Sequence, residues 1–168
     1  MNSRDCDASP VSGILVNHMP DTPEILAPAG DMTCLQAALD AGADAVYLGL
    51  ETFNMRQMAT RNFTRDTLPE ASRRCRERGA KLYLTLNSIL FDGELTALED
   101  TLRSAQPYID AAIVADWAAV EACKRLGVPF HISTQMSCSN TAAARFFKAQ
   151  GARRIVLARE LSLAQIAT

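Results

Sequence analysis

The chain has 168 residues, of which 48% are hydrophobic and 21% charged, and its formal net charge at pH 7 is −2. These values are typical of one globular domain with a hydrophobic core. The near balance of basic and acidic residues gives no argument for nucleic-acid binding by the domain as a whole, and leaves only a local basic patch open. No apolar stretch approaches the roughly 20 residues that a membrane-spanning helix needs.

The five cysteines and the N-terminal residues bear on the cellular compartment of the protein. The cysteines are widely scattered and include no CxxC pair, which favours reduced thiols and the cytoplasm over a disulfide framework. Residues 1–22 hold one short apolar piece, Ile14-Leu15-Val16, among Asp5, Asp7, Pro10, Gly13, Asn17, His18 and Pro20. A signal peptide would have a basic start and a longer apolar centre, so we expect a poorly ordered leader over 1–22.

Four predicted helices end at a glycine, and each glycine is followed within a few residues by a short apolar run. The four are Gly42, Gly79, Gly127 and Gly151. Glycine just past a helix end supplies the left-handed residue that turns the chain back. Because a strand follows every helix in the same direction, the pattern predicts a parallel α/β sheet.

The elements follow in chain order. Strands are predicted at residues 24–27, 45–48, 81–86, 111–114, 130–133 and 154–157. Helices are predicted at 32–41, in a stretch ending at 78, at 92–105, at 117–126 and in a stretch ending at 149. Their predicted N-caps are Asp31, Asp92, Asp116, either Ser139 or Asn140, and, for a further helix, Ser162. The helix ending at 78 either begins near Thr64 and is kinked by Pro69, or begins later with Pro69 in its first turn.

Six strand–helix units followed by an unfinished seventh element predict a parallel (β/α) TIM-like barrel that is incomplete. In this interpretation residues 23–168 are the N-terminal portion of the barrel, truncated at the C-terminus. A complete open sheet of six strands is the alternative. Unpaired sheet edges favour association with other chains, so we also expect self-association.

Two strands alternate between apolar and polar side chains. Leu82, Leu84 and Leu86 should point to one face, and Tyr83, Thr85 and Asn87 to the other. Residues 130–135 repeat the alternation, with Phe130 and Ile132 opposed to His131, Ser133 and Gln135. We expect the apolar face to contact the helices and the polar face to line a barrel interior with a binding site at its C-terminal mouth. An internal hydrogen-bond network is the alternative.

Arginines follow two of the predicted strands. Arg56 and Arg61 lie in the loop over 51–63, and Arg159-Glu160 follow the last strand. At the mouth of a barrel, such guanidinium groups could hold a carboxylate or a phosphate through paired hydrogen bonds. Solvated arginines and a structural ion pair are the alternatives.

Local motifs give little support to a hydrolase or a nucleotide-binding protein. The sequence has no GxSxG, HExxH, GxGxxG or GxxxxGK[ST] pattern. A pair formed by Cys138 and His131 is conceivable, because a nucleophile and its base need only meet in space. A packed cysteine is the favoured interpretation of Cys138.

Several segments, in their order and spacing, resemble the peptidase U32 family, the collagenase-like proteases. They are Glu24-Ile25-Leu26-Ala27-Pro28-Ala29-Gly30, Ala41-Gly42-Ala43-Asp44-Ala45-Val46-Tyr47-Leu48-Gly49, Phe53-Asn54-Met55-Arg56 with Asn62-Phe63, Leu86-Asn87, His131-Ile132-Ser133-Thr134-Gln135 and Ala158-Arg159-Glu160-Leu161-Ser162. The resemblance extends from about residue 24 to the last residue. It implies a TIM-like barrel at the N-terminus of a longer protein.

The resemblance also implies chemistry. Members of the family hydroxylate a tRNA wobble uridine or a ribosomal RNA cytidine, with prephenate implicated, and others hydroxylate a ubiquinone precursor without dioxygen, using an iron–sulfur cluster. The family's clustered cysteines lie beyond residue 168, and we expect no metal site within this chain. The motif positions that the resemblance places at the site are Asn54, Arg56, Asn62, Asn87, Gln135, Arg159 and Glu160.

The first hypothesis is therefore the N-terminal part of an oxygen-independent hydroxylation enzyme that acts on RNA. Its expected partners are a small anionic metabolite of the prephenate type and RNA, and its iron–sulfur cluster would be bound by cysteines beyond residue 168. The chain alone is expected to be inactive. The alternatives are a collagenase-like peptidase and a non-catalytic barrel subunit of a hydroxylase complex, as in ubiquinone biosynthesis.

Overall fold

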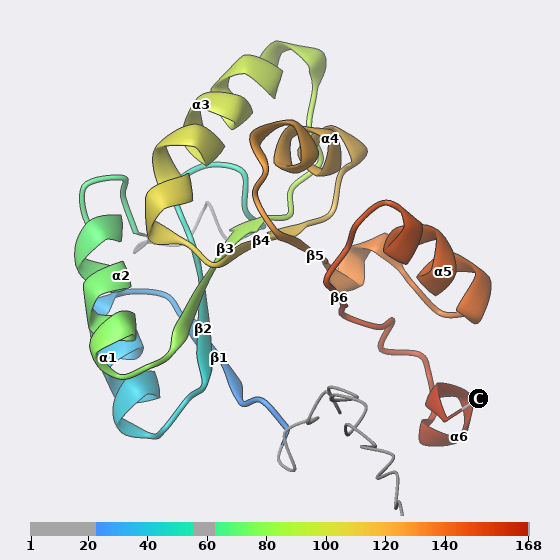
Figure 1. The fold of residues 1–168 in the computed structure, drawn as a ribbon, viewed down its shortest axis with the longest axis horizontal. Coiled ribbons are helices and arrows are strands. Elements are labelled where there is room, and N and C mark those ends of the chain that lie inside the picture. Colours follow the sequence, from blue (N-terminus) through green and yellow to red (C-terminus); the bar gives the residue numbers. More distant parts are fainter. Residues whose placement is uncertain (1–22, 56–62, 168) are drawn as a thin grey trace, which may run out of the picture.

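The computed structural model describes residues 23–55 and 63–167. Six parallel strands form one sheet in the order β1-β2-β3-β4-β5-β6. The sheet curls, and the helices cover its outer face, so the described residues form a half-barrel whose first and last strands stand at its two edges (Figure 1). The predicted incomplete TIM-like barrel is thus confirmed.

The elements keep the order expected from the sequence. The strands are β1 (Leu26–Ala29), β2 (Ala45–Gly49), β3 (Lys81–Leu86), β4 (Ala111–Val114), β5 (Phe130–Ile132) and β6 (Arg154–Ile155). The helices are α1 (Met32–Asp40), α2 (Leu68–Glu77), α3 (Leu95–Ala105), α4 (Trp117–Leu126), α5 (Thr141–Ala149) and α6 (Leu163–Ile166). Three 3₁₀ turns are η1 (Asp92–Glu94), η2 (Gln106–Tyr108) and η3 (Thr134–Met136). No helix in the described ranges is long and apolar enough to cross a membrane.

The first strand was predicted two residues too early. Residues 24–27 were expected to form it, but pairing with β2 runs from Leu26 to Ala29 and includes Pro28. Proline cannot donate to a sheet ladder, which is why Pro28 suggested the end of the strand. Because β1 is an edge strand with a single neighbour, the missing N–H of Pro28 can lie on the unpaired side.

The helix starts agree with the sequence in most cases. Side-chain oxygens of Asp31, Asp116, Asn140 and Ser162 accept hydrogen bonds from first-turn N–H groups. All four predicted joint glycines have positive φ angles. Pro69 lies in the first turn of α2, so the helix begins late, at Leu68, and the kinked alternative is wrong.

Asp92 is not the N-cap that the sequence suggested. It is the first residue of η1, and α3 begins only at Leu95. The Glu94 carboxylate accepts the N–H of Phe91 at 2.9 Å. The N–H of Glu94 donates to the carbonyl oxygen of Phe91 at 2.8 Å, and this i→i+3 bond closes a tighter 3₁₀ turn before the α-helix starts.

The two faces of the sheet are separated as predicted. Leu82, Leu84 and Leu86 are buried in the main core, between the sheet and the helices, together with Phe130 and Ile132. A smaller apolar cluster lies on the opposite face and consists of Ala45, Tyr83, Ala111 and Ile113, packed by Leu26 and Tyr47. The helix side therefore carries most of the buried apolar surface, and the inner face is left for polar groups.

A charged cluster lies at the N-terminal end of the barrel interior. The Glu24 carboxylate pairs with both guanidinium nitrogens of Arg154, accepts the Tyr83 hydroxyl at 3.1 Å and lies 3.3 Å from Lys81 Nζ. Glu24 precedes β1 and Arg154 begins β6, so this ion pair joins the two edges of the half-barrel. Hydrogen bonding to Arg154 lowers the pKa of Glu24 to about 2. Burial, with the charge of Arg154, lowers the pKa of the neighbouring His131 to about 4, so His131 is neutral at pH 7.

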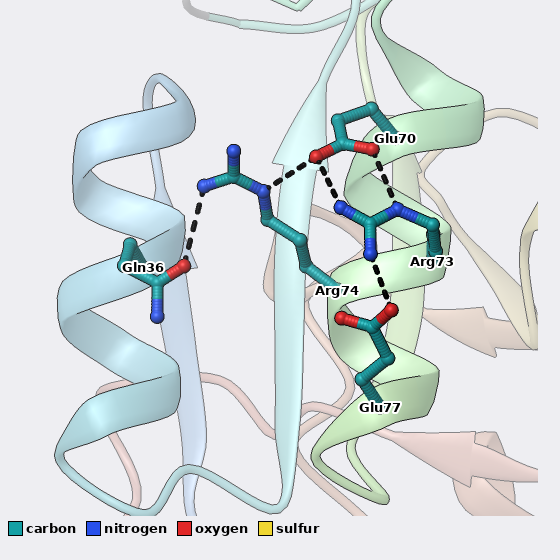
Figure 2. A network of polar contacts seen from close by, with 5 residues as sticks. All are labelled: Gln36, Glu70, Arg73, Arg74 and Glu77. Atoms are coloured by element: carbon teal, nitrogen blue, oxygen red, sulfur yellow. Dashed lines mark hydrogen bonds and ion pairs between the residues drawn. The ribbon is translucent and has the colours of Figure 1, made fainter.

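A second ion-pair network lies on the outer surface (Figure 2). The Glu70 carboxylate on α2 accepts hydrogen bonds from Arg73 and Arg74, and Arg74 reaches α1 by donating to Gln36 Oε1 at 3.2 Å. Arg73 also pairs with Glu77. Hydrogen bonds from Arg73 and then Arg74 lower the pKa of Glu70 to about 2. Because these groups are exposed, water screens their attraction and the network contributes little to stability.

We expect Glu24→Gln to lower the free energy of unfolding at pH 7 by about 2 kcal/mol. The folded-state pKa lies below its ordinary value of 4.5, so the carboxylate stabilises the fold above pH 4.5 and this contribution is lost as the pH falls toward 2. Urea unfolding across this range should show the wild-type and variant curves converging at low pH. Glu70→Gln, on the exposed network, is the control and should have a smaller effect. Equal effects of the two substitutions would contradict a special role for the edge-to-edge ion pair.

Candidate functional site

A pocket of about 490 Å³ opens at the carboxyl ends of the strands. Its apolar wall comes from the inner face of the sheet and includes Tyr47 and Ile113. Its polar lining consists of Asn54, Thr85, Asn87, Ser133, Thr134, Gln135 and Arg159. Ligand sites of parallel barrels lie at this end, because the loops that follow the strands meet there.

The sequence-predicted site residues fall into three groups. Four of them, Asn54, Asn87, Gln135 and Arg159, line the pocket together. Glu160 is exposed and is not part of the lining. Arg56 and Asn62 lie outside the described residues. The structure thus brings the four together, and their role in binding a ligand stays a prediction.

Asn54 is held firmly in place. Its side chain is 3% exposed and its Nδ2 donates to the carbonyl oxygen of Leu50. The preceding Phe53 is buried and has a φ of +61°, a conformation that costs energy for a residue with a side chain. The amide lies against the backbone of Gly49, where a Cβ atom would come within 2.6 Å of Asn54 Cγ.

Asn87 ties two loops together at the mouth. It is the first residue after β3, and its Oδ1 accepts the N–H of Met55 at 3.2 Å. The next residue, Ser88, donates its N–H to the carbonyl oxygen of Phe53 at 3.3 Å. Among the residues that the structure describes, the Nδ2 of Asn87 has no partner.

Gln135 is placed by the turn that follows β5. Ser133 Oγ accepts the N–H of Gln135 at 3.4 Å, and Thr134 Oγ1 donates to the carbonyl oxygen of Leu157 at 3.2 Å. The turn ends at Ser137 in a left-handed conformation, with a φ of +51°. The hydroxyl of Thr134 thus joins the loop after β5 to the segment after β6 that carries Arg159.

Part of the polar inner face is an internal network, which was the alternative interpretation. Thr85 Oγ1 donates to the carbonyl oxygen of Leu48 at 2.9 Å, so this hydroxyl proton is satisfied within the barrel. Sequence reasoning did not single out Gly49 or Thr134, although both lie in segments that carry the resemblance. The spacing of residues shows which segments resemble the family. Contacts such as that of Gly49 with Asn54 depend on how the loop folds back onto the strand.

The arrangement suits a small anion with an apolar body. Arg159 is exposed at the mouth and has no side-chain partner among residues 23–55 and 63–167. Its planar guanidinium can bind a carboxylate through two parallel hydrogen bonds. Amide groups of Asn87 and Gln135 can accept or donate further bonds, and the wall formed by Tyr47 and Ile113 can contact carbon atoms.

The described cysteines do not form a site for an iron–sulfur cluster. Cys34 is exposed, whereas Cys75, Cys123 and Cys138 are buried and unpaired. Burial raises the pKa of Cys75 to about 11 and that of Cys123 to about 12, so both are protonated. Within the described part of the chain, no three His, Cys, Asp or Glu side chains lie together to hold a metal ion.

The Cys138–His131 pair that the sequence left open does not form. Cys138 is fully buried in the core on the helix side of the sheet. His131 is on the inner face, where its ring meets the edge of Tyr83 with centroids 4.7 Å apart. The favoured interpretation of Cys138 as a packed residue agrees with this placement.

A sequence profile of peptidase family U32 matches residues 30–168. The chain belongs to this family. A solved U32 peptidase has the same fold, with a TM-score of 0.66 over 90% of this chain and 62% of that structure at 13% identity. A phosphonomutase-like barrel from Burkholderia cenocepacia is similar at a TM-score of 0.52, 16% identity and coverage of 86% and 71%. These distant likenesses concern the fold alone.

Relatives of this U32 chain include one named as a collagenase and others named as RNA hydroxylation proteins. It is 41% identical to a collagenase of Porphyromonas gingivalis over 146 residues, which are 86% of this chain and 35% of that protein. It is 40% identical to tRNA hydroxylation protein P1 of Bacillus subtilis, with coverage of 86% and 35%. It is 38% identical to the 23S rRNA 5-hydroxycytidine C2501 synthase of Escherichia coli, with coverage of 85% and 22%. The chain therefore spans about a third or less of the length of these relatives.

We expect Gly49→Ala to displace Asn54 from its place in the pocket wall and to destabilise the fold by about 1–3 kcal/mol, because the new methyl group would overlap the Asn54 amide. Gly93→Ala is the matched control, since a Cβ there would meet no atom within 4 Å. Urea unfolding measures both. Combining Gly49→Ala with Asn54→Ala should recover part of the loss, because the clashing amide is removed. A Gly49 variant as stable as the Gly93 variant would contradict this packing.

Proposed function

We propose that this U32 protein is part of an oxygen-independent hydroxylation enzyme that modifies RNA, and that the pocket binds a small anionic co-substrate of the prephenate type. The observation that carries the proposal is the position of Arg159, which has no side-chain partner among the described residues, beside amide groups at the C-terminal mouth of the barrel. The likeness to tRNA hydroxylation proteins of Bacillus subtilis, Helicobacter pylori, Escherichia coli and Haemophilus influenzae supports the choice of RNA. An RNA substrate favours the cytoplasm as the place of action.

In this proposal each pocket residue has a binding role. The Arg159 guanidinium holds one carboxylate of the co-substrate through paired hydrogen bonds, because charge-assisted pairs are the strongest such contacts. The Nδ2 of Asn87 and the amide of Gln135 orient its remaining oxygens. Tyr47 and Ile113 contact its apolar ring from the inner face of the sheet. Asn54, fixed over Gly49, shapes the side of the pocket at the carboxyl end of β2.

A peptidase is the second candidate. It is favoured by the identity of 41% with the collagenase of Porphyromonas gingivalis. The described residues offer this candidate no Cys–His pair, because Cys138 and His131 lie on opposite faces of the sheet. A Cys–His pair for this candidate would then have to come from other parts of the protein.

Nucleoside analysis distinguishes the two candidates. Deleting the gene in the native organism should remove one hydroxylated nucleoside from digests of tRNA or ribosomal RNA, measured by mass spectrometry. The intact wild-type gene should restore it, and a gene carrying Arg159→Ala should restore it poorly. Unchanged nucleosides together with gelatin cleavage by the purified protein would favour the peptidase instead.

We expect Arg159→Ala to weaken binding of a dicarboxylate such as prephenate by about tenfold or more, because a charge-assisted hydrogen bond is lost. Isothermal titration calorimetry on the intact protein provides the measurement. Glu160→Gln is the control, since the neighbouring Glu160 does not line the pocket and its loss should leave binding intact. Both residues are exposed, so thermal unfolding should not change. Unaltered affinity of the Arg159 variant would remove the anionic site from the proposal.

A further inference from the structure

Charge is distributed very unevenly along the chain, although the net charge is only −2. Residues 122–159 contain no Asp or Glu and hold seven basic residues: Lys124, Arg125, Arg145, Lys148, Arg153, Arg154 and Arg159. This stretch runs through the end of α4, β5, α5 and β6, which are neighbours on one side of the half-barrel (Figure 1). The rest of the chain is therefore acidic, and the basic residues of this stretch lie in neighbouring elements.

Only some of these basic groups are neutralised. Lys124 pairs with Glu121, Arg125 with Glu99 and Arg154 with Glu24. Arg145, Lys148 and Arg153 are exposed, and their side chains have no partner among the residues that the structure describes. Arg159, at the pocket, is likewise exposed and has no side-chain partner among the described residues. Among the described residues, four cations of this stretch thus have no side-chain partner: Arg145 and Lys148 within α5, Arg153 just before β6 and Arg159 after it.

Two exposed aromatic rings accompany these cations. Trp117 is 46% exposed and Phe146 is 52% exposed, although side chains of this size are usually buried. Their rings meet edge to face with centroids 5.5 Å apart. Trp117 also stacks on the buried Phe147, with centroids 5.8 Å apart and an interplanar angle of 23°. Because Phe147 anchors the pair, the exposed rings are held in a fixed arrangement.

The aromatic pair is on the pocket's end of the barrel. Trp117 is the first residue of α4, which begins at the carboxyl end of β4. The preceding Asp116 caps α4 and accepts the N–H of Leu90 at 3.4 Å, in the loop that continues from the pocket residue Asn87. Around α5, Phe146 and Lys148 lie on opposite flanks of the buried Phe147, and Arg145 lies on the outward face between them. We refer to Trp117, Arg145, Phe146 and Lys148 as the α5 surface.

We propose that the α5 surface binds an unpaired stretch of the RNA that the enzyme modifies. This inference rests on the proposed function. Single-stranded RNA offers both partners that the surface fits, since its phosphates are anionic and its unstacked bases can lie on aromatic rings. Arg145 and Lys148 contact phosphates, and Phe146 and Trp117 stack bases. An acidic peptide would match the cations but would leave the two exposed rings without a role.

The binding test uses the intact protein and a short unstructured oligoadenylate with a fluorescent label. Affinity is measured by fluorescence anisotropy over a series of salt concentrations. Arg145→Ser combined with Lys148→Ser should lower the slope of log affinity against log salt by about 1.4, since each lost phosphate contact on a single strand removes about 0.7. Arg103→Ser on α3 is the matched control, because Arg103 is also exposed and has no side-chain partner among the described residues.

A second pair of variants tests base stacking apart from charge. Phe146→Leu keeps an apolar side chain and should weaken binding by at least about fivefold, because a stacked base is lost. Phe146→Tyr keeps an aromatic ring and should retain the wild-type affinity. Phe146 is half exposed, so neither substitution should change thermal unfolding. A merely structural role of Phe146 would not distinguish Leu from Tyr in RNA binding.

Each outcome supports or overturns the inference. Wild-type binding with the expected losses in the α5 variants supports it. Wild-type binding that every α5 variant retains overturns it and leaves the proposed function standing. Failure of the wild-type protein to bind RNA overturns both the α5 surface and RNA as substrate. Equal binding of polyglutamate, with no effect of Phe146→Leu, would make the surface a general anion site and also overturn the inference.

Discussion

Packing of the helices against the leucine-rich face of the sheet is the constraint on which the rest of the structure depends. Leu82, Leu84 and Leu86 of the central strand are almost completely buried there, within a core to which every long helix contributes. Since side chains alternate along a strand, burying these leucines directs Tyr83 and Thr85 to the opposite face. The curl of the sheet then makes that face the interior of a half-barrel.

The interior is divided into two ends with different chemistry. At the N-terminal end, Glu24 and Arg154 compensate one another and link the first and last strands. At the C-terminal end, Arg159 has no such partner within the described residues and lies beside amides that the loops hold in place. A compensated ion pair supports structure, whereas an uncompensated cation among hydrogen-bond donors is suited to an anionic ligand.

Identifiable contacts hold the described parts of the site's loops in place. Phe53 and Ser137 have left-handed backbones, and each stands next to or near a pocket residue, Asn54 or Gln135. Asn87 and Thr134 bond to neighbouring loops. Backbone strain of this kind persists only where surrounding contacts impose it, and it occurs often at binding sites. The proposed RNA surface differs, since its aromatic rings stand on regular helices anchored by Phe147.

The order of the elements, the parallel sheet and the two faces of β3 were determined by the sequence alone, because glycine joints and two-residue alternation are local properties. The resemblance to the U32 family also placed Asn54, Asn87, Gln135 and Arg159 at the site, in segments that follow predicted strands. Only the tertiary structure decided that Pro28 lies within an edge strand, that Asn54 packs on Gly49 and that Glu160 is outside the pocket lining. The tertiary structure also decided that Cys138 and His131 lie on opposite faces of the sheet and that the rings of Trp117 and Phe146 are in contact. These features depend on contacts between residues distant in the chain or on the direction of side chains in turns, which residue spacing does not encode.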